Sequence, residues 1–210
     1  MDFEKKTFSE GLSPMDPPDA YAPPGNVEQV SYEQLHPILQ EFYDEHDEII
    51  DALKGFEETL ISIQKNGISK KASDQLRIFF HFFDHKFIPH DQREENILFP
   101  LLSERLIEKG EHSQGSDPTT AIDMMEDDHL KAVQLAAIIF NFFGLCVRLP
   151  DERSRLMVLD AAIEQGKSLV ELLQLHIFRE NTIIFPLAQK YIDKAEFDQM
   201  KRKKDQSIQN

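Results

Sequence analysis

The chain has 210 residues, of which 40% are hydrophobic, and its formal net charge is −15. This length fits one domain with tails, and the apolar content is sufficient for a core. A surface this acidic repels phosphate backbones, so we expect no nucleic-acid partner. The single Cys146 excludes an intramolecular disulfide and fits a reducing compartment. Because neither a signal peptide nor a membrane-spanning run is visible, we expect a cytoplasmic protein without membrane contact.

Residues 1–30 hold five prolines and few large aliphatic side chains, which is typical of an extended N-terminal tail. One helical domain is expected over residues 31–191. Residues 192–210 are charged and polar, so we expect a C-terminal tail with one short helix near Glu196.

Four long helices are predicted, because apolar residues recur in alternating steps of three and four. The first begins between Ser31 and Pro37, and Pro89 should kink the second. The expected ranges are about 31–67, 73–107, 119–147 and 151–191. Short connections between such helices predict an all-α, up-down antiparallel four-helix bundle.

Six polar residues occupy positions in these apolar seams, namely His46, His90, Glu94, His129, His176 and Glu180. Burying unpaired imidazoles and carboxylates is costly, and a bundle accepts it only with a compensating partner. Metal coordination supplies such a partner.

Two pairs of these residues belong to a repeated motif, His-x-x-x-Glu followed by four residues and Phe-Pro, at residues 90–100 and 176–186. A His and a Glu four residues apart lie on one face of a helix. Each half of the chain thus has a helix with one seam His, followed by a helix with this motif. Two such halves would place four His and two Glu around one cavity, enough for two metal ions bridged by both carboxylates.

Residues equidistant from a turn lie at the same height in an up-down bundle. Counting from the turns places His46, the pair of His90 and Glu94, and His129 at one level. The pair in the fourth helix is offset by about two helical turns. An irregular entry into that helix is therefore expected.

The four-helix pattern and the doubled motif resemble the hemerythrin-like (HHE cation-binding) family, from about residue 36 to residue 191. The resemblance implies an up-down bundle with a non-haem centre of two iron ions, bridged by carboxylates and an oxo group. It implies that the metal ligands are His46, His90, Glu94, His129, His176 and Glu180.

Three positions separate the chain from the oxygen-carrying members of that family. Met125 and Val133 occupy the places at which those members have a further His, and Asn181 occupies the place of an Asp. The set of four His and two Glu is more similar to the di-iron proteins linked to iron–sulfur cluster repair and nitric-oxide stress.

Several other polar residues are assigned outer roles. Glu95 and Asp47 are candidates to orient the ligand imidazoles as hydrogen-bond acceptors, and a position on a solvated face is the equal alternative for both. His81 and His85 lie four apart but off the seam, so we expect them in solvent or in an outer role. The ferritin-type motif Glu-x-x-His occurs once, at residues 33–36, without the second copy that such a site needs.

The expected function is to bind or react with a small diatomic molecule such as oxygen or nitric oxide, or to handle iron under oxidative or nitrosative stress. Two alternatives stay open: a di-iron oxidoreductase or peroxidase-like enzyme, and a helical interaction module without metal. Zinc or manganese would also fit the ligand types. The charged tails are compatible with an unidentified protein partner.

Overall fold

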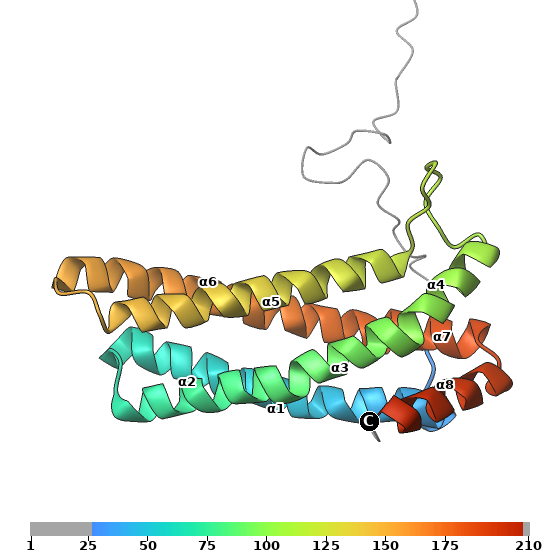
Figure 1. Cartoon of the computed structure of the whole chain (residues 1–210), viewed down its shortest axis with the longest axis horizontal. Coiled ribbons are helices and arrows are strands. Elements are labelled where there is room, and N and C mark those ends of the chain that lie inside the picture. The colour runs from blue at the N-terminus through green and yellow to red at the C-terminus, as the bar shows by residue number, and fades with distance from the viewer. Residues whose placement is uncertain (1–26, 208–210) are drawn as a thin grey trace, which may run out of the picture.

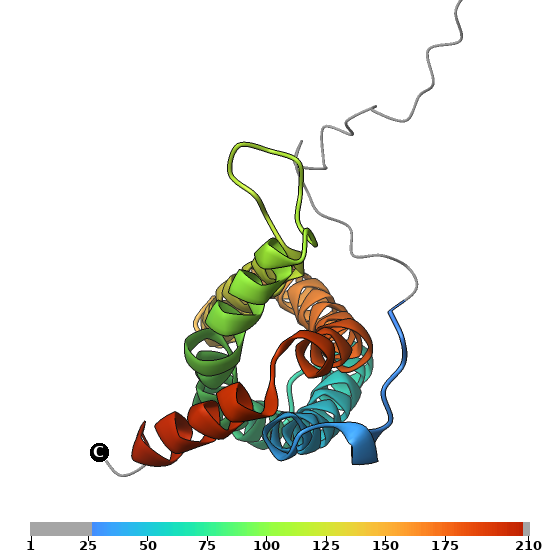
Figure 2. The same cartoon turned by 90° about the vertical axis from the view of Figure 1, so that its right-hand side faces the viewer.

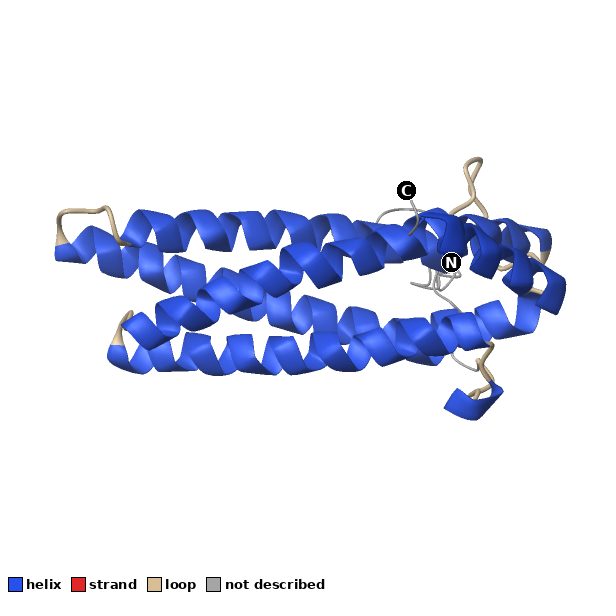
Figure 3. Ribbon diagram, turned by 60° about the horizontal axis from the view of Figure 1, so that its bottom comes forward, coloured by secondary structure: helices blue, strands red, loops and turns tan. Residues whose placement is uncertain are grey.

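The computed structural model describes residues 27–207, and every regular element in this range is helical. This confirms the all-α class. The long helical segments run along the longest axis of the molecule, and consecutive segments run in opposite directions (Figures 1 and 3). Most of the expected N-terminal tail, residues 1–26, and residues 208–210 lie outside the described residues.

The first long helix is α1 (Pro37–Asn66). The capping pair Ser31 and Gln34 serves a separate 3-10 turn, η1, and the Ser31 N–H donates to Gln34 Oε1 at 3.0 Å. A proline is well suited to start α1, because the N–H groups of a first helical turn have no intrahelical acceptor. Gly67 ends the helix with a φ of 74°, a value that glycine adopts without strain.

The second segment is one uninterrupted run of helix from residue 70 to residue 108. It consists of α2 (Lys70–Phe82), the π turn η2 (Phe83–Phe87), α3 (Ile88–Arg93), the π turn η3 (Glu94–Leu98) and α4 (Phe99–Glu108). It begins three residues earlier than expected, because the Ser69 side chain accepts a hydrogen bond from the Ala72 N–H and caps the helix.

The third segment is α5 (Ala121–Cys146), and the fourth consists of α6 (Glu152–Arg179), the π turn η4 (Glu180–Ile184) and α7 (Phe185–Tyr191). The short helix expected near Glu196 is α8 (Lys194–Ser207), which has 14 residues. Its side chains Phe197 and Met200 are buried. Figure 2 shows α8 crossing one end of the long segments.

Each π turn precedes a proline. The N–H groups of Ile88, Phe99 and Phe185, each directly before a proline, donate to the carbonyl five residues earlier. Proline has no N–H, and in an α-helix its ring meets the carbonyl four residues back. A π turn inserts one extra residue and so accommodates the ring. The kink expected at Pro89 takes this form, and Glu94 and Glu180 are the first residues of the other two turns.

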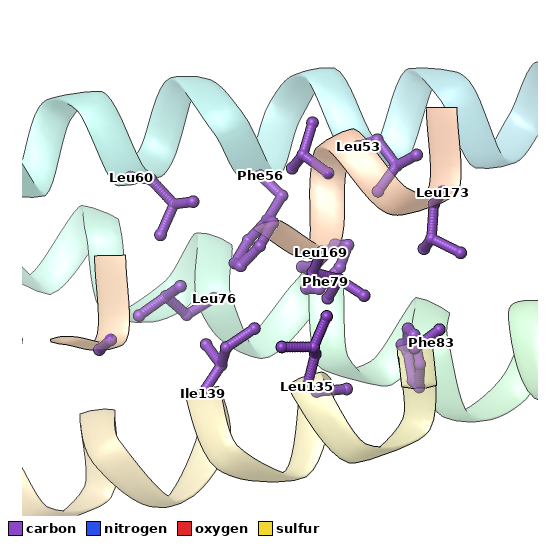
Figure 4. Close-up of a cluster of buried hydrophobic side chains, with 14 of the residues drawn as sticks. Leu53, Phe56, Leu60, Leu76, Phe79, Phe83, Leu135, Ile139, Leu169 and Leu173 are labelled. Carbon is purple, nitrogen blue, oxygen red and sulfur yellow. The ribbon is translucent and has the colours of Figure 1, made fainter. Parts of the chain in front are cut away.

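The buried apolar side chains form two clusters. The first, which we call the distal cluster, lies toward the turns at residues 67–69 and 147–151 and includes Leu53, Phe56, Leu60, Phe79 and Leu173 (Figure 4). The second, the terminal cluster, lies toward α7 and α8 and includes Leu39, Phe42, Phe99, Phe185 and Phe197. The six polar seam residues separate these two clusters along the long segments, except that Ile177 of the distal cluster follows His176.

The offset expected in the fourth segment is taken up at the turn between α5 and α6. Helix α5 ends at Cys146, 17 residues after His129, whereas α6 begins at Glu152, 24 residues before His176. Figure 1 shows α6 starting beyond the end of α5, with the turn running outward to meet it. The additional residues of α6 therefore return His176 to the level of His129.

Within the described residues, α5 is a helix long and apolar enough to cross a membrane by length and composition, which differs from the expectation that no such run exists. Its most apolar stretch is 39% buried. A core helix of a soluble protein passes the same test, and α5 carries the buried His129. Its outer face is also apolar, with Leu130, Phe140 and Leu145 exposed.

Candidate metal centre

The structure brings all six polar seam residues together, and all six are buried. The four imidazoles come from α1, α3, α5 and α6, and the two carboxylates from the first residues of η3 and η4. The doubled motif therefore points inward in both copies. The distances between their nitrogen and oxygen atoms decide whether the six residues could hold a metal ion.

The imidazoles form two facing pairs. The Nε2 atoms of His46 and His90 lie 3.1 Å apart, and those of His129 and His176 lie 3.0 Å apart. Donor atoms around one metal ion with bonds of about 2.1 Å are separated by roughly 3 Å when they are neighbours. Each pair thus has the spacing of two ligands of one ion.

Glu180 lies between the two imidazole pairs. Its Oε2 is 3.1 Å from His46 Nε2, and its Oε1 is 3.2 Å from His176 Nε2.

Glu94 occupies the matching position. Its Oε2 is 3.5 Å from His90 Nε2 and 3.6 Å from His129 Nε2. Two groups result, each with candidate ligand atoms within 4.8 Å of one another, and both groups contain Glu94 and Glu180. The arrangement is geometrically able to hold metal ions at two positions that share both carboxylates.

The carboxylates have no other polar partner. Both oxygens of Glu94 and both oxygens of Glu180 are buried without a hydrogen bond to any residue that the structure describes. Leaving such groups unpartnered is costly. A bound cation would compensate that cost, so the donor set fits a metal.

The two carboxyl groups differ in protonation although their motifs match. Burial raises the pKa of Glu94 well above its usual range, and the nearby Glu180 raises it further. Burial also acts to raise the pKa of Glu180, but the charged His176 imidazole lowers it well below its usual range. These shifts favour the neutral acid at Glu94 and an ion pair between Glu180 and His176 when no cation is bound. Metal binding would displace these protons.

Each imidazole turns its outer nitrogen toward an oxygen acceptor. His90 Nδ1–H donates to Glu45 Oε2 at 2.7 Å, and Arg93 also binds that carboxylate. His176 Nδ1 lies 3.6 Å from Asp128 Oδ2, which accepts a hydrogen bond from Arg179 at 3.1 Å. The same arrangement of Arg, carboxylate and His thus occurs in both halves.

The other two imidazoles are held by the residue that follows each carboxylate in the chain. His129 Nδ1–H donates to Glu95 Oε1 at 2.9 Å, and His46 Nδ1–H donates to Asn181 Oδ1 at 2.8 Å. Because the two partner atoms, Glu95 Oε1 and Asn181 Oδ1, are oxygens that accept, they favour the tautomer whose Nε2 lone pair faces inward. Metal-binding histidines typically have this arrangement.

Of the two candidates, Glu95 contacts the imidazole of His129, whereas Asp47 lies on the solvated face. Asp47 is exposed, and Glu45, on the other side of His46, binds the imidazole of His90 instead. Four further outer residues were not predicted, namely Arg93, Asp128, Arg179 and Asn181. For three of them the signal in the sequence is a repeat: an acidic residue precedes His46 and His129, and Arg stands three residues after each motif His.

Asp91 is a further residue that the sequence analysis missed. It is 5% exposed, and its Oδ1 lies 3.7 Å from His129 Nε2. Burial raises the pKa of Asp91 to about 8. His81 and His85, by contrast, are exposed, and the His85 ring nitrogen contacts the His81 carbonyl rather than the centre.

Comparisons of the chain with models of protein families, with curated proteins and with solved structures find no match. The case for a function therefore rests on the convergence of buried imidazoles and carboxylates described above.

Proposed function

We propose that this chain is a hemerythrin-like four-helix bundle that holds two non-haem iron ions and binds or reacts with oxygen or nitric oxide. The observation that carries the proposal is the set of four inward-facing Nε2 atoms around two buried carboxylates, whose oxygens form no hydrogen bond to the described residues. The antiparallel course of the long helical segments supports the bundle (Figure 3).

The ligand set suits iron in both of its common oxidation states, because it mixes imidazole with carboxylate. Each ion would receive two imidazoles and would share Glu94 and Glu180 with the other. Four protein ligands leave positions open in a six-coordinate ion. Iron bound there supplies the affinity for a diatomic ligand and the capacity to exchange electrons with it.

Aromatic side chains of the terminal cluster hold the imidazoles and keep water away. The ring of Phe185 stacks on His46 with centroids 5.4 Å apart, and that of Phe99 stacks on His129 at 5.7 Å. The edge of Phe42 packs against His90 at 5.7 Å. Such an apolar surrounding favours a small uncharged ligand over a hydrated ion.

A mostly apolar pocket of about 280 Å³ lies between the second segment and α5, and its lining also includes the polar Asp84 and Asn141. Its lining includes Ile88, two residues before His90, and Val133, four residues after His129. The pocket therefore lies one helical turn from two of the proposed ligands, and its apolar lining suits a diatomic gas.

Metal analysis of protein expressed with iron tests the proposal, combined with optical spectra in the presence of oxygen and of nitric oxide. We expect two iron ions per chain, one for each ligand group, and absorption bands that change with either gas. The variant His90→Ala with His176→Ala should lose both properties, whereas His81→Ala with His85→Ala should retain them. If the first double variant matches the parent in iron content and melting, the bundle is an interaction module rather than an iron protein.

A further inference from the structure

The two halves of the centre share the residues of their motif, so a difference beside a motif residue is informative. Each motif His is followed three residues later by Arg and four residues later by Glu. The residue directly after the motif His differs. It is Asp91 in the first half and Ile177 in the second.

The side chain of Ile177 is 2% exposed and belongs to the distal cluster. An apolar residue at this position is thus compatible with the packing. Asp91 places a carboxyl group in an equivalent position, also buried, where a helix would be expected to carry an apolar side chain.

A buried acid that only supports the fold normally has its oxygens hydrogen-bonded. Asp91 Oδ1, however, makes no hydrogen bond within residues 27–207. Native proteins rarely leave a buried polar atom unpaired, and such an atom calls for a specific explanation. The polar atom that faces Asp91 Oδ1 is His129 Nε2, at 3.7 Å, which is itself a proposed ligand atom.

This distance fits a shared ion. In an octahedron with bonds of about 2.1 Å, neighbouring donors lie about 3 Å apart and opposite donors about 4 Å apart. Asp91 Oδ1 lies between these values from His129 Nε2. His129 belongs to the group that also contains His176 and the two shared carboxylates, whose ligand atoms lie within 4.8 Å of one another, and Asp91 is outside that limit.

We propose that Asp91 is an additional carboxylate ligand of the ion held by His129 and His176, and that it makes the two metal positions inequivalent. This inference rests on the proposed function. The ion beside Asp91 has five protein ligands and binds first and more tightly. The ion held by His46 and His90 has four, keeps more open positions, and is where an exogenous ligand binds.

Titration of the metal-free protein with Co²⁺ tests this assignment without any reaction of the loaded centre. Co²⁺ does not change oxidation state in air-free buffer, and its absorption reports each bound ion. We expect two binding steps in the parent. Asp91→Asn and Asp91→Ala should weaken the tighter step by roughly tenfold or more and merge it with the other, while the stoichiometry stays at two.

Variants of the imidazoles identify the tighter position. His129→Ala should remove the tighter step, and His46→Ala should remove the weaker one. Asp47→Asn is the matched control, because Asp47 also follows a seam His but is exposed, and it should leave both steps unchanged. Asp91→Glu keeps a carboxylate and should preserve two separate steps.

The possible outcomes separate the two proposals. If the dissociation constants of the two binding steps are unchanged from the parent in Asp91→Asn and in Asp91→Ala, Asp91 is not a ligand. The di-metal centre itself would remain supported by that result. Loss of the tighter step in His46→Ala rather than His129→Ala would overturn the role of Asp91 as well. A parent protein that binds no Co²⁺ and no iron would remove the proposed function, and the role of Asp91 with it.

Discussion

The Nε2 atoms of His129 and His176 lie 3.0 Å apart, with the outer nitrogen of each ring directed at a carboxylate. Two such atoms can share one proton between them, or they can both bind one metal ion that lies to the side of the line joining them. The same holds for His46 and His90, at 3.1 Å. In the absence of metal, the centre therefore concentrates nitrogen lone pairs and unpartnered carboxyl oxygens in the core.

Metal removal should destabilise the protein without unfolding it. The distal and terminal clusters bury apolar side chains independently of the centre, so the metal-free chain should remain helical. Free metal at about 100 times its dissociation constant should add about 2.7 kcal/mol per site to the free energy of unfolding. Thermal unfolding followed by circular dichroism, with chelator and with added Fe²⁺, measures this difference. Equal melting temperatures under both conditions would contradict it.

The two bridging carboxylates should respond differently to the same substitution in the metal-free protein. Glu94 is neutral there, so Glu94→Gln should change the melting temperature little. Glu180 pairs with His176 at 3.2 Å, so Glu180→Gln leaves a buried charge uncompensated and should cost about 3 kcal/mol or more. Denaturant unfolding with chelator present measures both values, and metal analysis should show that each variant loses metal. A larger destabilisation from Glu94→Gln would reverse the assignment of the two protonation states.

The outer carboxylate Glu45 should matter for metal affinity although it touches no metal. It orients His90 and is itself held by Arg93. Replacing such an outer partner typically lowers metal affinity by about 10- to 100-fold. Competition with a chromophoric chelator should show this loss in Glu45→Gln, and Asp47→Asn should bind like the parent. Equal losses in both variants would indicate a general charge effect instead.

Much of the fold and all six central residues were predictable from the sequence, because both depend on helical periodicity. A seam position faces the core whatever the neighbouring helices do, so spacing alone correctly placed His46 and Glu180 in the interior. The length of α8 was not predicted from the sequence. This helix is stabilised by the packing of Phe197 into the terminal cluster, and a short apolar pattern does not show that contact.

Which residues contact the outer nitrogens of the imidazoles depends on how each helix is rotated against its neighbours. The spacing of residues within one helix does not show that rotation. Asp47 and Glu45 flank His46 equally in sequence, yet only Glu45 faces the second segment. Asp91 was missed for a related reason. It follows a motif His, where a helical wheel places it beside the seam, and its contact with His129 of α5 is purely tertiary.

The contact between α1 and α6 in the distal cluster leaves no space at Gly166. A Cβ added there would meet Leu60 Cδ1 at 2.6 Å and Cδ2 at 3.0 Å, and Leu60 is fully buried. We expect Gly166→Ala to lower the free energy of unfolding by about 1 kcal/mol, because an overpacking cost of about 1–3 kcal/mol exceeds the helix-propensity gain of about 1 kcal/mol.

Gly55→Ala is the matched control in α1. Nothing lies within 4 Å of a Cβ at that position, so only the propensity gain applies and stability should rise by up to about 1 kcal/mol. Denaturant unfolding measures both variants. A stabilised Gly166→Ala protein would show that Leu60 repacks freely. The double variant Gly166→Ala with Leu60→Ala should cost less than the sum of the single changes, because the two sites share one contact.

His36 should make the docking of α8 depend on pH. Its ring stacks on Phe197 with centroids 4.5 Å apart, and its Nδ1 accepts the Ile38 N–H at the start of α1. Burial lowers the pKa of His36, and Asp198, 3.8 Å away, only partly opposes this. A histidine whose pKa is lower in the folded state binds protons more readily when unfolded. Its contribution is therefore fully present above the unfolded pKa of about 6.5 and is lost as the pH falls below it.

Hydrogen exchange of the α8 backbone amides, measured between about pH 7.5 and pH 5.5 and corrected for intrinsic exchange rates, checks this expectation. Protection of α8 should decrease toward the lower pH, because protonated Nδ1 no longer accepts the Ile38 N–H. His36→Asn keeps a side-chain acceptor at the N-cap but does not titrate, so its protection should be lower overall and independent of pH in this window. The same decrease in His36→Asn as in the parent would assign the effect to another group, because the variant retains every other contact of α8.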